Sequence, residues 1–229
     1  MKLHLNGIVI IVGAYGSGKT EVSINLALHM QKEGTNVRLA DLDLVNPYFR
    51  SREARHVLER SGVDVVLPPD MYMHADLPIL TPKVSGMLRK PSGLTLLDVG
   101  GDDAGATVLA ALAEPLADKS YEVLMVINPR RPYTDSVEGC LSIKRQIEAK
   151  ARLKITGFVS NANLMDQTEV EDIGDGYDFC LQVAQQANTR LAFITAAAGL
   201  LTRLDKNVIQ CPILPIRRQL TFPWQPMKS

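Results

Sequence analysis

The sequence predicts an α/β domain built on a mostly parallel central sheet with helices on both faces. The first observation is alternation, because apolar, β-branched runs suited to buried strands take turns with segments whose apolar residues recur at helical spacing. The second observation is a glycine-rich turn between the first such strand and the first such helix. Strands that are apolar throughout are typical of parallel sheets, whose crossover helices cover both faces.

Each element follows from this alternation. The strand-like runs cover residues 7–13, 36–44, 64–67, 94–99, 121–128, 154–160, 191–195 and 213–216. The helix-like segments cover residues 19–33, 50–61, 104–118, 135–151 and 177–189. No Pro- or Ser-rich linker and no internal repeat divides the chain, so we expect residues 1–229 to form a single domain. Outside the pattern stand a Pro- and Met-rich insertion at 68–91, expected to be irregular, and a C-terminal tail at 219–229.

The composition argues against several classes of protein. The 25 basic and 25 acidic residues cancel, which disfavours a protein that coats nucleic acid, and we expect no nucleic-acid partner. Cys140, Cys180 and Cys211 lie far apart without the paired spacing of a zinc or iron–sulfur site. No apolar run approaches the length of a membrane helix. We therefore expect a soluble cytoplasmic protein without a membrane partner.

Residues 13–20, GAYGSGKT, match the phosphate-loop pattern G-x-x-x-x-G-K-[ST] at every defined position. The glycines permit positive φ, so that successive backbone N–H groups can turn inward around phosphate oxygens at the positive end of the next helix. The Lys19 ammonium should reach the β- and γ-phosphates, and the Thr20 hydroxyl should bind Mg²⁺. The expected nucleotide contacts from this region are Gly13, Tyr15, Gly16, Ser17, Gly18, Lys19, Thr20 and Glu21.

Two acidic strand ends supply the remaining chemistry. Asp98 ends the apolar run LTLLD, where P-loop proteins place a carboxylate that coordinates Mg²⁺, and Gly101 lets the backbone bend toward a γ-phosphate. Asp41 and Asp43 end the second strand; residues i and i+2 project from one strand face, so both carboxylates could face one site. The alternative for Asp43 is a turn or cap residue before Pro47.

These residues divide into two expected roles. The metal-binding group contains Thr20, Asp41 and Asp98, and the catalytic group contains Lys19, Asp43 and Asp102. Asp43 and Asp102 are rival candidates for orienting an attacking water molecule, and the sequence does not rank them.

These elements, in their order, resemble the nucleotide-binding domain shared by the MinD, ParA and CobQ/CobB proteins, a SIMIBI-type branch of P-loop ATPases. The resemblance covers about residues 7–218 and includes DLD at 41–43, LLDVGGD at 96–102, INP at 127–129, GFVSN at 157–161 and CPILPI at 211–216. It implies that Asn161 contacts adenine, that Pro215 lies near the base, and that the loops after Asp41 and Asp98 act as switches. The cofactors it implies are ATP and Mg²⁺.

The departures from that family narrow the expectation. MinD and ParA carry a second lysine early in the P-loop that reaches across a dimer, whereas this chain has Ala14. The tail TFPWQPMKS is too short and Pro-broken for the amphipathic membrane helix of MinD. The guanine-reading motif N-K-x-D is absent, because Asn161-Ala162-Asn163-Leu164 lacks both the Lys and the Asp. ATP is therefore favoured over GTP.

Three functions remain open at this point. The leading one is a Mg²⁺-ATP-binding ATPase that acts as a nucleotide-dependent switch for a protein partner, with a homodimer as one option. The second is a ligase or synthetase that activates a carboxylate with ATP, as CobQ/CobB and dethiobiotin synthetase do. The third is an ATP-gated interaction module that does not hydrolyse.

Several smaller features have two readings. The insertion at 68–91 could be an irregular crossover or a lid and partner surface, with a helix start at Thr81-Pro82. Arg50, Arg52 and Arg55 could dock an anion or begin a solvated helix. The last group is expected to be structural: surface turn residues Arg130 and Arg131, a helix cap at Thr134/Asp135 with Glu138, and a solvated loop at Glu169, Glu171 and Asp172.

Overall fold

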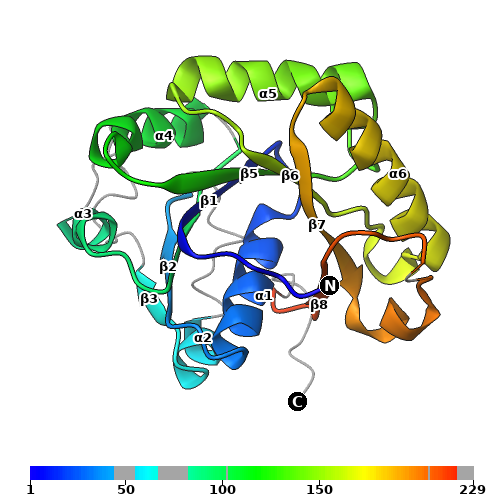
Figure 1. Ribbon diagram of the computed structural model, residues 1–229, viewed down its shortest axis with the longest axis horizontal. Coiled ribbons are helices and arrows are strands. Elements are labelled where there is room, and N and C mark those ends of the chain that lie inside the picture. The colour runs from blue at the N-terminus through cyan, green and yellow to red at the C-terminus, as the bar shows by residue number, and fades with distance from the viewer. Residues whose placement is uncertain (44–54, 67–81, 102, 206, 221–229) are drawn as a thin grey trace.

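The computed structural model describes residues 1–43, 55–66, 82–101, 103–205 and 207–220. Within these ranges the chain forms one twisted sheet with helices packed on both of its faces (Figure 1). This is the α/β architecture that the alternating sequence pattern predicts.

The eight strands of the sheet all pair in parallel, in the order β3-β2-β4-β1-β5-β6-β7-β8. In chain order they are β1 (Gly7–Gly13), β2 (Val37–Asp41), β3 (Asp64–Val66), β4 (Leu94–Asp98), β5 (Tyr121–Ile127), β6 (Gly157–Ser160), β7 (Arg190–Ala197) and β8 (Ile213–Ile216). All eight expected strands are present. Because the carboxyl ends of parallel strands meet at one edge, the loops after β1, β2, β4 and β6 converge there.

Alternate residues of β1 pack on opposite faces of the sheet, as the two-residue period of a strand requires. Ile8 and Ile10 belong to the core that contacts the helices drawn in green to gold in Figure 1, whereas Val9 and Ile11 belong to the core beneath α1 and α2. The helices are α1 (Lys19–Lys32), α2 (Arg55–Arg60), α3 (Pro82–Arg89), α4 (Asp103–Leu116), α5 (Val137–Ala151) and α6 (Val170–Gln186), with 3₁₀ turns at η2 (Met165–Gln167) and η3 (Ala198–Arg203).

The start of α6 differs from the prediction. Glu169, Glu171 and Asp172 do not form a solvated loop; the helix begins at Val170 and runs through the predicted start at residue 177. Glu169 and Asp172 form a reciprocal capping box, in which the Asp172 side chain accepts from the Glu169 N–H at 3.0 Å. An acidic pair can thus cap a helix as Ser/Thr with Glu does, and the two glycines that follow weaken the helical pattern in the sequence.

The cap of α5 also lies slightly later than expected. Ser136 is the N-cap, and its Oγ accepts a hydrogen bond from the Gly139 N–H at 3.2 Å. Thr134 is buried instead, and its hydroxyl donates to the Asn128 carbonyl at 2.8 Å. The predicted cap residue therefore stabilises the preceding turn rather than the helix.

The stretch 68–91 is not irregular throughout, because its last part forms α3 from Pro82. Proline suits this position since the first helical residue needs no N–H donor. Val84, Met87 and Leu88 bury one side of α3 against the sheet. Residues 67–81 lie outside the described residues, so the choice between a crossover and a lid remains a prediction.

Helix α6 lies unusually close to the end of β6 at one glycine. A Cβ atom at Gly176 would lie 2.2 Å from the Cβ of Ala162, whereas a Cβ at Gly174 would meet nothing within 4 Å. Both glycines sit in the same helix, so they separate the effect of close packing from that of backbone entropy.

We expect Gly176→Ala to destabilise the protein by about 1–3 kcal/mol through overpacking. Gly174→Ala should stabilise it by about 0.5–1 kcal/mol, because alanine reduces the conformational entropy of the unfolded chain. Urea unfolding of both variants measures the difference. Shifts of the same sign would show that α6 does not depend on this close approach.

Candidate functional site

The P-loop lies between β1 and α1 in the conformation that phosphate binding needs. Gly16 and Gly18 have φ values of 73° and 88°, in the region that favours glycine. Gly18 also marks a close approach, because a Cβ there would lie 2.3 Å from Asn161 Nδ2. Gly13 ends β1, and the Tyr15 side chain is 74% exposed at the tip of the loop.

Lys19 begins α1 and is 7% exposed. Its ammonium donates to the Ala14 carbonyl at 3.0 Å, so it lies across the loop whose phosphate it is expected to bind. A Cβ at Gly101 would be 2.7 Å from Lys19 Nζ and 2.6 Å from the Gly13 carbonyl oxygen. Only glycine therefore allows the turn after β4 to approach the P-loop this closely.

Two carboxylates are buried at the ends of neighbouring strands. Asp41 pairs in register with Asp98, and each residue is only 1% exposed. Burial first, and then the negative charge of Asp41, raise the pKa of Asp98 to about 7. The Thr20 hydroxyl and the Lys19 ammonium lower the pKa, while the Asp43 charge raises it again. The protonation of Asp98 is therefore coupled to the other two expected metal ligands, Thr20 and Asp41, and to the P-loop lysine, Lys19.

The donor set fits a hydrated Mg²⁺ ion. Asp98 Oδ1 accepts a hydrogen bond from Ser23 Oγ at 3.2 Å, while the buried Oδ2 makes no hydrogen bond within the described part of the chain. A cation or a water in its shell would satisfy that oxygen. The residues that the structure describes include no group of three or more His, Cys, Asp or Glu side chains suited to a metal. Phosphate oxygens and water would have to complete the shell beside Thr20, Asp41 and Asp98.

Ser23 was not expected from the sequence. It is fully buried one turn after Lys19, on the side of α1 that faces β4. The i, i+4 spacing from the P-loop lysine was the available signal, but a serine in a helix interior is too common for that spacing to be informative.

Asp43 does not share a strand face with Asp41, because β2 ends at Asp41. The Asp43 N–H donates to Asp41 Oδ1 at 3.1 Å, which forms a local side-chain turn directly after β2. Strand periodicity therefore does not apply to Asp43, but its charge acts on Asp98, and a shared site for Asp41 and Asp43 stays a prediction. Asp102, its rival, lies outside the described residues.

The Asn161 side chain, at the end of β6, is hydrogen-bonded to the P-loop. Its Nδ2 donates to the Ser17 carbonyl at 2.7 Å, and its Oδ1 accepts from the Thr195 hydroxyl at 2.6 Å. Asn161 and Thr195 are both buried. The Asn161 amide is thus hydrogen-bonded within the protein, and its expected contact with adenine stays a prediction. Thr195, which orients the amide, was not predicted.

Glu21 likewise contacts the protein. Its Oε1 accepts from Asn25 Nδ2 and from the Gln219 N–H, both at 2.8 Å, and its Oε2 accepts from the Leu220 N–H at 3.2 Å. Burial raises the pKa of Glu21, and the two backbone hydrogen bonds oppose that shift. The Glu21 side chain thus holds the segment after β8, and the expected contact of Glu21 with nucleotide stays a prediction. Pro215 lies within β8 and is partly exposed.

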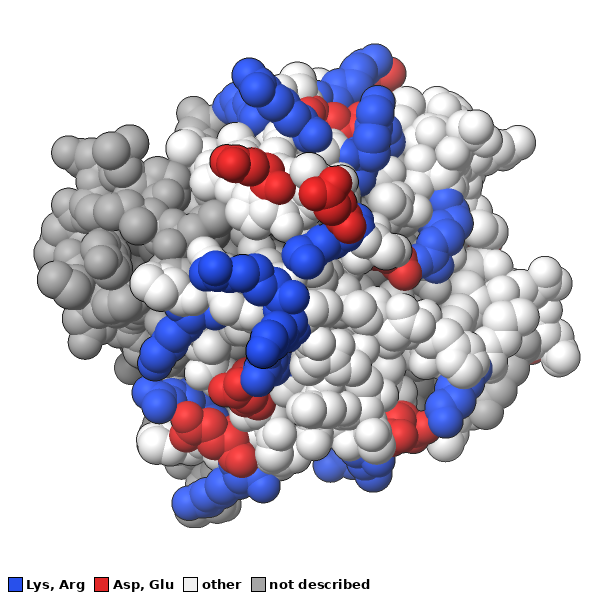
Figure 2. All heavy atoms as spheres, turned by 60° about the vertical axis from the view of Figure 1, so that its left-hand side comes forward, with Lys and Arg blue, Asp and Glu red and all other residues white. Residues whose placement is uncertain are grey.

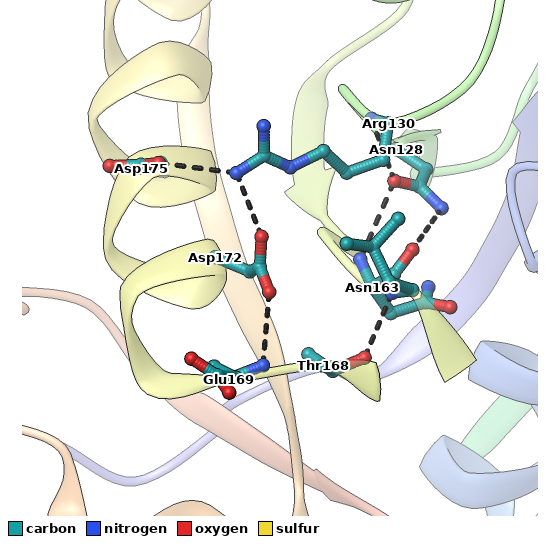
Figure 3. A network of polar contacts seen from close by, with 8 residues as sticks. Asn128, Arg130, Asn163, Thr168, Glu169, Asp172 and Asp175 are labelled. Atoms are coloured by element: carbon teal, nitrogen blue, oxygen red, sulfur yellow. Dashed lines mark hydrogen bonds and ion pairs between the residues drawn. The ribbon is translucent and has the colours of Figure 1, made fainter. Parts of the chain in front are cut away.

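Arg130 belongs to a network that joins β5, β6 and α6 (Figure 3). Asn128 Oδ1 accepts from the Arg130 N–H at 3.0 Å, and Asn128 Nδ2 donates to the Asn163 carbonyl at 3.2 Å. The Arg130 guanidinium pairs with Asp172 at 2.8 Å and Asp175 at 3.2 Å. Arg130 therefore lies in a turn, as expected, and ties that turn to α6.

The face toward α3 and β3 carries mixed charges, with Lys and Arg beside Asp and Glu (Figure 2). Arg38 pairs with Asp64 at 3.1 Å, and Arg55 pairs with Glu59 at 2.7 Å. Arg55, considered above as an anion contact, is thus paired within α2, while Arg50 and Arg52 lie outside the described residues.

None of the helices in the described ranges combines the length and apolar character needed to cross a membrane.

No protein-family model matches the chain, and no curated protein matches its sequence. The fold is similar to that of the cell division protein FtsY from Thermotoga maritima, with a TM-score of 0.60 and 21% identity over 86% of this chain and 65% of that one. Chloroplast FtsY from Physcomitrella patens gives a TM-score of 0.57 and 19% identity over 84% of this chain and 59% of that one.

The Signal Recognition Particle 54 kDa protein from Aeropyrum pernix, solved in complex with GDP, gives a TM-score of 0.56 and 20% identity over 85% of this chain and 42% of that one. The chain spans less than two thirds of each of these structures. At these identities the likeness concerns the fold. The parallel sheet with a P-loop between β1 and α1 is thus the fold that this chain shares with these structures.

Proposed function

We propose that the chain binds ATP with Mg²⁺ at the P-loop and acts as a nucleotide-dependent switch. One observation carries the proposal: the Lys19 ammonium, the buried Asp98 and the close turn at Gly101 meet at the start of α1. A buried carboxylate pair beside a buried lysine is costly unless a ligand or counter-charge compensates it. A metal–phosphate group would supply both charges.

Each residue then has a distinct task. Lys19 exchanges the Ala14 carbonyl for phosphate oxygens, and the P-loop N–H groups surround the same anion. Thr20, Asp41 and Asp98 hold Mg²⁺, with Ser23 orienting Asp98. The bound ion would neutralise charge on the phosphate oxygens. Asp43 or Asp102 would accept a hydrogen bond from the attacking water and orient it.

The switch role follows from where these loops lie. The turn at Gly101 touches the P-loop, so a γ-phosphate would compete for the same space and move the chain after β4. The loop after Asp41 begins at the same edge. We propose that their two arrangements are read by a protein partner, a second copy being one option, and that the protein works in the cytoplasm.

The preference for ATP rests on the absence of N-K-x-D after β6. A similarly folded protein, the 54 kDa protein of the signal recognition particle, was solved with GDP, so both purines must be tested. Turnover that requires a small carboxylic acid would favour the synthetase, and tight ATP binding without turnover would favour the interaction module.

Lys19→Ala should weaken Mg²⁺-ATP binding by at least about 100-fold, because several charge-assisted hydrogen bonds are lost. Calorimetric titration with ATP and with GTP, each with and without Mg²⁺, measures this directly. Lys32→Ala, in the last turn of the same helix, is the matched control and should bind as the wild type does. Normal affinity in Lys19→Ala would place the nucleotide elsewhere.

The stability of the protein without metal and nucleotide should depend on Asp98. Its folded-state pKa of about 7 lies above the ordinary value of 3.8, so the folded protein holds a proton that the unfolded chain releases. This contribution is complete below the ordinary pKa and is lost as the pH rises to about 7, by up to about 1.4 kcal/mol per pH unit.

Asp98→Asn removes that titration. Relative to this variant, the wild type should lose stability from about pH 4.5 to about pH 7 and then level off, as measured by denaturant unfolding in chelator. Parallel stability curves for the two proteins would contradict the protonation of Asp98 in the folded state.

Asp43→Asn and Asp102→Asn separate the two candidates for orienting water. The residue that does so should lower ATP turnover by about 10²–10⁴-fold while leaving the ATP dissociation constant within about twofold. Single-turnover hydrolysis together with titration distinguishes them. Unchanged turnover in both variants would remove both residues from the mechanism.

A further inference from the structure

The segment after β8 is held by α1 rather than by the sheet. We call residues 217–220 the strap; they follow the last residue of β8, Ile216. Asn25 Oδ1 accepts from the Arg217 N–H at 2.9 Å, and Glu21 accepts from the N–H groups of Gln219 and Leu220. Three of the four strap residues are therefore bound through their backbone by two side chains of one helix.

The two α1 side chains act as one unit. Asn25 is 5% exposed, and its Nδ2 donates both to Glu21 Oε1 at 2.8 Å and to the Glu21 carbonyl at 2.9 Å. Leu220 is buried in the same core as the inner face of α1. A half-buried carboxylate is stable at such a position when its acceptor sites are used, so the contacts favour this course of the backbone.

The strap also reaches the loop after β6. The Arg218 guanidinium lies 3.5 Å from Asp166 and 3.7 Å from the Met165 sulfur, both in the turn η2. Asn161, which supports the P-loop at Ser17, lies at the start of the same loop. The strap and this loop therefore flank the end of α1 that carries the P-loop.

The position of the expected metal ligands indicates which part of the nucleotide would lie between the strap and the loop after β6. The expected metal ligands Asp41 and Asp98 lie on β2 and β4, on one side of β1. A Mg²⁺ ion held by these residues would neutralise charge on the terminal phosphate, which would therefore lie on that side. The α-phosphate and the nucleoside must then extend the other way, past Glu21 toward the ends of β6 and β8.

We propose that Glu21 and Asn25 are positioning residues that hold the strap as one wall of the nucleoside site. They do so by binding its backbone, and they set affinity for the base and ribose without contributing to triphosphate binding. The inference rests on the proposed function, because it assumes that the phosphates occupy the P-loop.

The test compares two ligands, ATP and inorganic tripolyphosphate, each with Mg²⁺. Glu21→Ala should weaken ATP binding by about 10-fold, the effect of losing two partly buried hydrogen bonds to the strap backbone, and leave the affinity for tripolyphosphate within about twofold. Glu21→Gln keeps one acceptor and should restore part of the ATP affinity. Unchanged tripolyphosphate affinity also shows that the variant is folded with an intact P-loop.

Two further variants make the design specific. Asn25→Ala should also weaken ATP binding. The double variant Glu21→Ala/Asn25→Ala should bind ATP no more weakly than the weaker of the two single variants, since both residues hold one strap. Glu33→Ala is the matched acidic control: it caps the other end of α1, pairs with Lys2 and should change neither ligand.

Hydrogen exchange of the Arg217, Gln219 and Leu220 amides gives an independent readout. ATP should increase their protection in the wild type and fail to do so in Glu21→Ala, whereas tripolyphosphate should add none in either protein. An equal loss of affinity for ATP and tripolyphosphate in Glu21→Ala, or no loss of affinity for ATP, would overturn the proposal. Failure of the wild type to bind either ligand would instead overturn the proposed function on which it rests.

Discussion

The burial of two carboxylates side by side is the constraint on which the site depends. Asp41 and Asp98 lie opposite each other on β2 and β4, and the charge of each raises the free energy of the other. Lys19, the Thr20 hydroxyl and Ser23 partly compensate this repulsion. The folded protein without ligand therefore favours one proton on the pair, and a metal–phosphate group would replace that proton. Ligand affinity and resting stability are set by the same unfavourable charge pair.

The P-loop is shaped by its neighbours as much as by its own glycines. Asn161 holds the Ser17 carbonyl from one side, with its amide oriented by Thr195, and the turn at Gly101 presses on the loop from the other. Small side chains or none are required at these contacts, since a single added methyl group would overlap with a polar atom. A ligand that displaces the Gly101 turn would move the chain after β4 and leave the loop after β6 in place. The two sides of the site would therefore respond differently to the ligand.

Helix α1 connects these sides. Its first turn supplies Lys19 and Thr20 to the phosphate end, and Glu21, with Asn25 one turn later, binds the strap. Because a helix places residues i and i+4 on one side, the pair at 21 and 25 faces the strap while the pair at 19 and 23 faces β4. One helix thus positions both walls of the site, and a displacement of α1 at the phosphate end would also displace the residues that bind the strap.

Much of this was predictable from local sequence. Periodicity placed every strand of the sheet, and the GAYGSGKT motif placed the phosphate site, because both depend on residues close together in the chain. The partners of those residues were not predictable. Asn161 and the strap meet the P-loop region across more than a hundred residues, and only the parallel order of the sheet brings them there. The sequence by itself determined the fold class, the P-loop and the Asp98 strand end, since these are local patterns. The tertiary structure alone decided that Asn161 and Glu21 serve the protein's own backbone, because such contacts depend on which strand ends lie side by side.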